Sequence, residues 1–313
     1  MSSIRTLRTF LAVARLGSFA AAGKEIGLTA AAVGQQVRAL EEELHLTLFD
    51  RSGRSIVLNT AGRARVAQVV DLVSHFEALA ARHGDAQLGG TVVMGALVSA
   101  LMGAFADCLW SLKQQHPALE VKLLAGQSAN FALRVERGEL DAAVVTQPPA
   151  RISSSLVWTP LYSEPMVLIV PRQPHFELPD RALNMLAQCP FMRFDRQLWT
   201  GQLVDEVIAS CGAKVQEAME LDSVEAIIAL VRQGFGISVV PQLANEQWSR
   251  DAALRVVPLK GVNVQRHVGL LERRQHSGQR FTRAIKDYFP KGSAQRTTGS
   301  TLTAQTRRNK ALR

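Results

Sequence analysis

The stretch SFAAAGKEIGLTAAAVGQQVRALEEEL, residues 18–44, decides how the first domain folds. It is rich in alanine, yet Gly23, Gly27 and Gly34 interrupt it, although a glycine inside a helix costs about 1 kcal/mol relative to alanine. Small residues allow a close approach by another helix, a membrane or a nucleic acid. The glycines therefore predict a surface that contacts a large partner at short distance.

Capping residues divide this part of the chain into three helices. Periodicity predicts a first helix from Ile4 to Leu16. Ser18 is placed to cap a second helix that runs to about Ile26, and Thr29 is placed to cap a third. The buried face of the third helix is expected to hold Val33, Val37, Leu40 and Leu44. Its outer face is expected to hold Ala31, Gly34, Gln35 and Arg38.

Two helices joined by a short turn are typical of a helix-turn-helix, whose second helix lies in the DNA major groove. Small residues keep the start of that helix slim, while Gln35 and Arg38 can reach base edges or phosphates. Residues 48–58 fit a hairpin beside it, a wing. The predicted DNA contacts are Ser18, Thr29, Ala30, Ala31, Gly34, Gln35, Arg38, Arg51 and Arg54. The pattern alone leaves open a helical hairpin that serves only packing.

Residues 62–87 carry apolar side chains in a strict 3-4 alternation. This spacing is typical of the seam of a two-helix coiled coil, so it predicts a dimer. The predicted seam consists of Val66, Val69, Val73 and Phe76, continued by Ala80. A single helix packed on its own domain gives the same spacing and stays open as the alternative, because only about three heptads are present.

The chain has 313 residues and a net charge of +9, which by itself suggests a nucleic-acid partner. Six bases and no acid lie in residues 291–313: Lys291, Arg296, Arg307, Arg308, Lys310 and Arg313. This tail has few apolar residues and is predicted to be disordered. Most of the excess charge therefore belongs to the tail and says little about the folded part.

Several classes of protein are disfavoured by composition. The apolar runs are too short for a membrane helix, and Arg15 interrupts the only stretch that imitates a signal peptide. Cys108, Cys189 and Cys211 form no CxxC pair, and the seven histidines lack metal-ligand spacing. We therefore expect a cytoplasmic protein with no membrane contact, no metal and no cofactor.

After residues 89–90, a Gly-Gly pair, strands and helices alternate, which indicates parallel sheets covered by helices. The strands expected first are Val92–Ala96, Leu119–Leu124 and Ala142–Val145, with helices from Ser99 to about Gln115 and Ser128 to about Arg137. A second block has strands near 166–170, 191–194, 215–220 and 236–240. The chain then returns through residues 265–271 and a helix over 278–289. Two α/β lobes with a cleft between them are expected.

The sequence up to about Phe289 resembles that of a LysR-type transcriptional regulator. The N-terminal matches include Gly17-Ser18-Phe19, Ala21-Ala22, Leu28-Thr29, Ala32-Val33, Leu40-Glu41, Leu48-Phe49 and Ala61-Gly62. Later matches include Gly138-Glu-Leu-Asp141, Pro160-Leu-Tyr162 and Leu230-Val-Arg-Gln-Gly-Phe-Gly236. The family commonly has proline where this chain has Ala31 and serine where it has Gly34. The phosphate contact expected from that serine is therefore missing.

This resemblance implies a winged helix-turn-helix, a dimerising linker helix and a two-lobed effector domain akin to type 2 periplasmic binding proteins. It also implies a dimer of dimers that binds double-stranded DNA with an interrupted inverted repeat, responds to a small organic effector and acts on RNA polymerase. We expect the segments to be 1–60 (winged helix-turn-helix), 61–88 (linker helix), 89–162 plus 265–290 (lobe I), 163–264 (lobe II) and 291–313 (tail).

The effector is expected beyond the carboxyl ends of the strands, where helices begin. In lobe I these positions hold Ser99, Ser128 and Thr146, although either serine also fits an ordinary helix cap. In lobe II, Arg193 ends a strand and Arg196 and Trp199 follow it. A guanidinium there would bind a carboxylate, although either arginine also fits a surface ion pair. We predict an organic anion.

Other functions are less well supported. A redox sensor needs a reactive, resolvable cysteine pair, and the surroundings of Cys189 and Cys211 show no basic environment. An enzyme on the same two lobes is disfavoured because the sequence has no phosphate loop, GxSxG elbow or dinucleotide fingerprint. A solute-binding protein would not need the first 88 residues. No catalytic residue is therefore expected.

Overall fold

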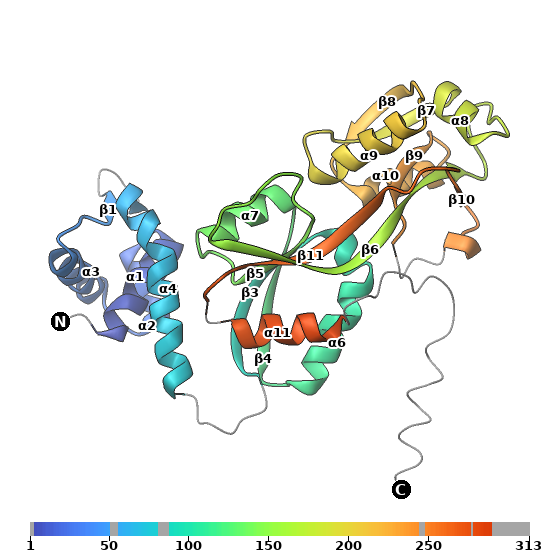
Figure 1. The fold of residues 1–313 in the computed structure, drawn as a ribbon. Coiled ribbons are helices and arrows are strands. Elements are labelled where there is room, and N and C mark those ends of the chain that lie inside the picture. The colour runs from blue at the N-terminus through green and yellow to red at the C-terminus, as the bar shows by residue number, and fades with distance from the viewer. Residues whose placement is uncertain (1–2, 51–55, 81–87, 244–247, 277, 290–313) are drawn as a thin grey trace, which may run out of the picture.

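The computed structural model describes residues 3–50, 56–80, 88–243, 248–276 and 278–289 (Figure 1). The N-terminal domain begins with helices α1 (Ile4–Leu16), α2 (Phe19–Ile26) and α3 (Ala30–Leu44). A side-chain oxygen caps each start: Ser3 accepts from the Thr6 N–H, Ser18 from Ala21 and Thr29 from Ala32. The predicted caps Ser18 and Thr29 are therefore confirmed.

Each of the three glycines in residues 18–44 has a different structural role. A Cβ on Gly23 would lie 2.4 Å from the Leu28 carbonyl oxygen, so only glycine allows the turn to pass this close. Gly27 ends α2 in the left-handed region, at φ +71°. Gly34 is buried beside the Phe19 ring, with 3.6 Å between an added Cβ and the ring. The prediction that Gly34 points outward is wrong, because the ring of α2 covers this side of α3.

The wing is present as a two-stranded antiparallel hairpin. Strand β1 (Phe49–Asp50) pairs with β2 (Val57–Leu58), and Phe49 lies opposite Leu58. The connecting residues, including Arg51 and Arg54, lie outside the described part of the chain.

Helix α4 (Thr60–Ala80) follows the wing and lies on the side of the N-terminal domain that faces the rest of the molecule (Figure 1). Val69 and Val73 are 5% and 6% exposed within one chain, because they pack in the core that holds Phe10 and Val13 of α1. These two side chains are therefore not a dimer seam. For Val69 and Val73 the 3-4 spacing instead reflects a single helix packed on its own domain, the alternative that the sequence left open. Phe76, one turn further, is 50% exposed.

Lobe I contains strands β3 (Gly90–Ala96), β4 (Leu119–Ala125) and β5 (Ala142–Thr146). Helices α6 (Ala104–Gln115) and α11 (Gln279–Tyr288) cover one face of this sheet, and α7 (Ser128–Glu136) covers the other (Figure 1). A short helix, α5 (Val98–Leu101), precedes α6. One helix was predicted over this region, but the chain breaks at Gly103, which begins α6.

Lobe II contains strands β7 (Pro190–Phe194), β8 (Gln216–Leu221), β9 (Ser238–Pro241) and β10 (Leu254–Val257). Its helices are α8 (Ala182–Gln188), α9 (Trp199–Ser210), α10 (Val224–Arg232) and the 3₁₀ turn η1 (Trp248–Arg250). They enclose a separate apolar core that includes Phe191, Ile227 and Trp248. The two lobes thus have independent cores.

Two long strands connect the lobes. Strand β6 (Leu156–Pro171) pairs with β11 (Gln265–Arg273) along its first half and with β9 and β10 along its second half. The sheet order is β10-β6-β11-β5-β3-β4, with β9 also on β6. Strands β3, β4 and β5 run parallel, whereas β6 and β11 run antiparallel to their neighbours. The expected boundary at residues 162–163 falls inside β6, and the predicted tail lies outside the described residues.

Candidate functional site

A cavity of about 170 Å³ lies where the two lobes meet. Lobe I contributes Leu97 and the start of α5, the β4–α7 connection, the start of α7 and the start of β11. Lobe II contributes the end of β7, the start of α9 and the β8–α10 connection. The lining residues are Leu97, Val98, Ser99, Gly126, Gln127, Ser128, Ala129, Phe194, Leu198, Trp199, Thr200, Asp222, Ser223, Val224, Glu225 and Arg266.

Of the predicted effector residues, Ser99, Ser128 and Trp199 line this cavity. Thr146 is buried just behind it: its N–H donates to Ser128 Oγ at 3.2 Å, and its Oγ1 lies 3.3 Å from Thr200 Oγ1 of lobe II. Neither serine is a helix cap, since Leu97 and Gln127 occupy the cap positions. The cap alternative is therefore wrong for both serines.

The hydroxyl groups of Ser99 and Ser128 both accept a hydrogen bond from behind the cavity. Ser99 Oγ accepts from Arg266 Nη1 at 2.9 Å, and Ser128 Oγ accepts from the Thr146 N–H. Within the described part of the chain, neither serine proton has an acceptor. Because a hydroxyl that already accepts still carries its own donor, both protons are available to a ligand in the cavity.

Arg266 is the basic residue of the cavity, and no sequence pattern singled it out. It is the second residue of strand β11 and is 1% exposed. Its Nε donates to Glu164 Oε2 at 2.8 Å, and its Nη2 donates to the same oxygen. Burial raises the pKa of Glu164, while the charge of Arg266 opposes the rise. A buried ion pair of this kind holds Arg266 in place at the back of the cavity.

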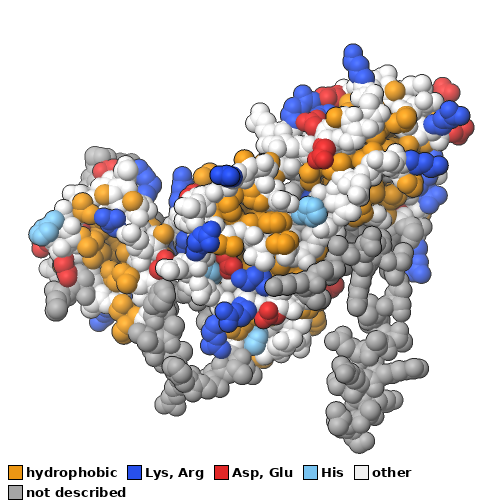
Figure 2. All heavy atoms as spheres, in the orientation of Figure 1, with side chains coloured by type: hydrophobic (Ala, Val, Ile, Leu, Met, Phe, Trp, Pro, Cys, Tyr) orange, Lys and Arg blue, Asp and Glu red, His pale blue; other side chains and the backbone are white. Residues whose placement is uncertain are grey.

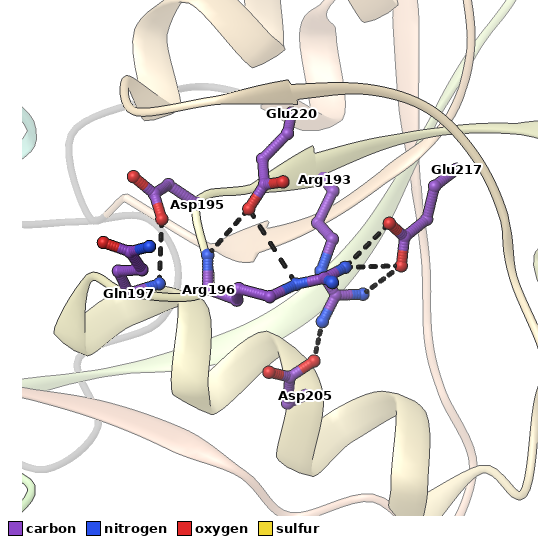
Figure 3. Close-up of polar contacts among 7 residues, drawn as sticks. All are labelled: Arg193, Asp195, Arg196, Gln197, Asp205, Glu217 and Glu220. Atoms are coloured by element: carbon purple, nitrogen blue, oxygen red, sulfur yellow. Dashed lines mark hydrogen bonds and ion pairs between the residues drawn. The ribbon is translucent and has the colours of Figure 1, made fainter.

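Arg193 and Arg196 are not among the lining residues. Figure 3 shows both guanidinium groups turned toward Glu217 on the neighbouring strand β8. Arg193 also pairs with Asp205 of α9, and Arg196 Nη2 lies 2.7 Å from Glu217 Oε2. The structure thus does not bring these arginines to the cavity. Arg196 forms the surface ion pair that the sequence allowed, with 48% of its side chain exposed, whereas the side chain of Arg193 is 5% exposed and its charge is buried.

Two carboxylates lie on the lobe II side of the cavity. Gln127 Nε2 of lobe I donates to Asp222 Oδ2 at 3.3 Å, so a hydrogen bond spans the two lobes. Glu225 Oε2 accepts from the Ser223 hydroxyl at 2.7 Å. The donors from serine and arginine therefore stand on one side of the cavity and the acids on the other.

The cysteines are placed outside this site. None of the three lines the cavity, and Cys108 and Cys189 are fully buried. Burial raises the pKa of all three thiols, that of Cys108 to about 12. A thiol with a raised pKa is a poor nucleophile at neutral pH, so the geometry does not favour redox sensing. Among the described residues no cluster suited to a metal ion occurs, and no helix is long and apolar enough to span a membrane.

The second candidate surface is the outer face of α3. Ala30, Ala31, Gln35 and Arg38 are exposed there, and Ser18 and Thr29 stand at the starts of α2 and α3. Among the described residues, the side chains of Gln35 and Arg38 form no hydrogen bond or ion pair. Long polar side chains without partners on a slim helix face can donate to DNA.

Two family models match the chain: the bacterial regulatory helix-turn-helix protein of the lysR family over residues 4–63, and the LysR substrate binding domain over residues 85–292. The chain is 28% identical over 283 residues to a probable RuBisCO transcriptional regulator of Cyanophora paradoxa, covering 86% of this chain and 85% of that one.

Solved structures show the same fold. A full-length single-residue variant of OxyR from Pseudomonas aeruginosa has a TM-score of 0.72 and 20% identity, covering 92% of this chain and 98% of that one. Full-length CbnR complexed with its target DNA has a TM-score of 0.53 and 22% identity, covering 92% and 100%. Since the family models match well over half of the residues, the chain belongs to the LysR family of transcriptional regulators, non-enzymatic proteins that join a helix-turn-helix to an effector-binding domain.

Proposed function

We propose that this regulator binds double-stranded DNA at an interrupted inverted repeat, with α3 in the major groove. The free side chains of Gln35 and Arg38 support this, as does the CbnR structure, which contains target DNA. Ala30 and Ala31 allow close seating, while Ser18 and Thr29 lie at helix starts, where phosphate binds. Arg51 and Arg54 would extend the contact from the wing.

Dimerisation would use the exposed part of α4. Leu72 is 58% exposed and Phe76 is 50% exposed, on a helix whose other apolar residues include the buried Val69 and Val73. Figure 2 shows hydrophobic side chains on the face of this domain that carries α4. A second copy would cover them, with Val66 at the edge of the contact. A dimer of dimers that acts on RNA polymerase in the cytoplasm completes the proposal.

The effector would be a small organic anion in the cavity between the lobes. The observation that carries this is the pair of serine protons, from Ser99 and Ser128, that have no acceptor among the described residues. The starts of α7, α9 and α10 meet at the same cavity, and each contributes partial positive charge. Arg266 lies behind Ser99 and strengthens it as a donor. The anion would lie on the lobe I side, away from Asp222 and Glu225.

A thermal-shift screen tests the effector class. It would use sodium salts of the mono- and dicarboxylic acids from acetate to adipate, together with benzoate, and the matching amides as neutral controls. A ligand that binds only the folded chain raises Tm. We expect a carboxylate to raise Tm and its amide to do so far less. A screen in which only amides bind would contradict the proposed class.

A mobility-shift assay with DNA from the region upstream of the gene tests the DNA-binding part. We expect retardation that survives excess unrelated DNA. Retardation that unrelated DNA removes completely would contradict sequence-specific binding.

A further inference from the structure

Helix α4 is used on two opposite faces. Val69 and Val73 point into the core of the N-terminal domain. Ala67 and Asp71 are four residues apart and therefore neighbours on one face, about 200° around the helix from Val69. That second face meets lobe I. The helix is thus held between the DNA-binding domain and the effector domain of the same chain.

The contact with lobe I is close at Gly138. This residue has φ +73°, and a Cβ added to it would lie 2.9 Å from the Ala67 Cα. The backbone of lobe I therefore touches the helix directly, with no room for a side chain between them. Glycine is required here for its conformation and for its size.

Beside Gly138, the buried Arg273 faces the helix. Its side chain is 5% exposed, and its Nη1 donates to the carbonyl oxygens of Val135 at 2.7 Å and Leu140 at 3.2 Å. Its Nη2 lies 3.5 Å from Asp71 Oδ1 and has no hydrogen-bond partner among the described residues. A buried guanidinium needs a counter-charge.

The carboxylate that forms an ion pair with Arg273 is Asp71, at 3.5 Å. Asp141 is also near Arg273, but its Oδ2 accepts from the Val93 N–H at 2.8 Å, and burial raises its pKa. Asp71 belongs to α4 and Arg273 belongs to strand β11, so their ion pair links α4 to lobe I.

Both elements that meet at Arg273 begin at the effector cavity. Strand β11 carries Arg266 in the cavity lining and Arg273 seven residues later, about 23 Å along an extended strand. Helix α7 begins with Ser128 in the lining and ends near Val135, whose carbonyl Arg273 holds. A displacement of either element at the cavity therefore reaches the same guanidinium.

We propose that Asp71 and Arg273 form the contact through which lobe I sets the position of the DNA-binding domain, and through which occupation of the cavity changes that position. The coupling part rests on the proposed effector function. The positioning part stands on the contact itself. Asp71 is a positioning residue that touches neither DNA nor effector.

Distances between spin labels on the full chain test the positioning part. The labels would be placed at Glu42→Cys on α3 and Leu133→Cys on α7, both exposed, with Cys211 replaced by serine and the two buried cysteines kept. An excess of unlabelled chain restricts the signal to pairs within one chain. We expect a narrow distance distribution for the parent.

Substitutions at position 71 decide the outcome. Asp71→Asn should broaden or shift the distribution, whereas Asp71→Glu, which keeps the charge, should retain it. Asp50→Asn removes an equal charge from an exposed position of the wing and should change nothing. Ala67→Leu should separate the surfaces by steric contact with Gly138 and broaden the distribution without a charge change. A parent-like distribution for Asp71→Asn would overturn the proposal, whatever the distribution for Ala67→Leu.

The acid that raises Tm most in the screen tests the coupling part. It should shift the distribution in the parent and in Asp71→Glu. In Asp71→Asn it should bind with an affinity within about twofold of the parent and cause no shift. An equal shift in Asp71→Asn would overturn the coupling. If no acid binds, the effector proposal fails, while the distances without ligand still decide the positioning part.

Discussion

Arg266 and Ser99 are 167 residues apart in the chain, yet the guanidinium Nη1 donates to the serine hydroxyl at 2.9 Å. The bond joins strand β11, which returns from lobe II, to the short helix α5 at the cavity in lobe I. It fixes the hydroxyl oxygen and leaves its proton for a ligand. The anion proposed for this cavity would therefore meet a donor that is already ordered, which reduces the ordering cost of binding.

Replacement of both Gln35 and Arg38 by alanine should weaken binding to the preferred DNA site. Loss of a side chain that reads a base costs about 1 to 3 kcal/mol at that site, whereas loss of a phosphate contact weakens all sequences alike. Fluorescence anisotropy with specific and scrambled DNA separates the two effects. Arg137→Ala, on the exposed surface of lobe I, is the control for charge. Unchanged affinity and specificity in a folded double variant would remove this face from the DNA contact.

Val73→Glu and Phe76→Glu should behave differently, although both positions belong to one 3-4 pattern. Val73 is 6% exposed, so a carboxylate there should destabilise the folded chain by several kcal/mol. Phe76 is 50% exposed, so its variant should still fold cooperatively but lose assembly. Thermal unfolding and light scattering give the two readouts. A Phe76→Glu chain that assembles like the parent would exclude the exposed face of α4 as the dimer contact.

Glu272 should make stability depend on pH in the acid range. Burial would raise its pKa, but hydrogen bonds from His276 and Lys286 outweigh burial and lower the pKa from 4.5 to about 2. A carboxylate with a lowered folded pKa stabilises above its unfolded pKa, and this stability disappears as pH falls from 4.5 toward 2. The shift corresponds to ~3 kcal/mol at neutral pH.

Unfolding of Glu272→Gln and the parent between pH 3 and 7 checks this prediction. The difference in unfolding free energy should be largest near pH 7 and shrink on acidification. Glu136→Gln removes the same charge from an exposed position of α7 and should show no such trend. A difference that does not vary with pH would contradict the assignment.

Truncation after Pro290 should flatten the salt dependence of DNA binding. The deleted residues carry six bases and no acid, and each neutralised phosphate contributes a log-log salt slope of roughly 0.9 in magnitude. The preference among DNA sites should remain, because basic side chains that contact phosphates carry no sequence information. Titrations at several salt concentrations measure the slope. An equal slope in the truncated chain would show that the tail does not touch DNA.

Local signals predicted most of the fold. Ser18 and Thr29 are at the caps, and the apolar runs near Val92 and Leu119 became strands, because capping and alternation act over a few residues. The same signals could not tell which surface covers an apolar face. Val69 and Val73 fit a coiled coil and a packed helix equally well, and only the position of α1 decides between them. Gly34 was misplaced for the same reason, since the covering ring comes from another helix.

The lining of the proposed effector cavity was predicted in part. Ser99, Ser128 and Trp199 could be selected because strand ends and helix starts meet at one edge. Arg193 and Arg196 drew attention because they follow a strand, but their partner Glu217 comes from another strand more than 20 residues away. Arg266 gave no signal in the sequence, because its partners Glu164 and Ser99 are more than 100 residues away and come near it only in the folded chain.

The most direct test of the effector site is calorimetric titration of the parent, Ser99→Ala and Ser128→Ala with the acid found in the screen. A lost bond to an anion is worth up to about 3 kcal/mol. Ser154→Ala, which removes an exposed hydroxyl from lobe I, is the matched control. We predict that both cavity variants bind the acid measurably more weakly, while Ser154→Ala binds as the parent does and DNA affinity without effector is unchanged. Equal affinities in all four proteins would contradict the proposed site.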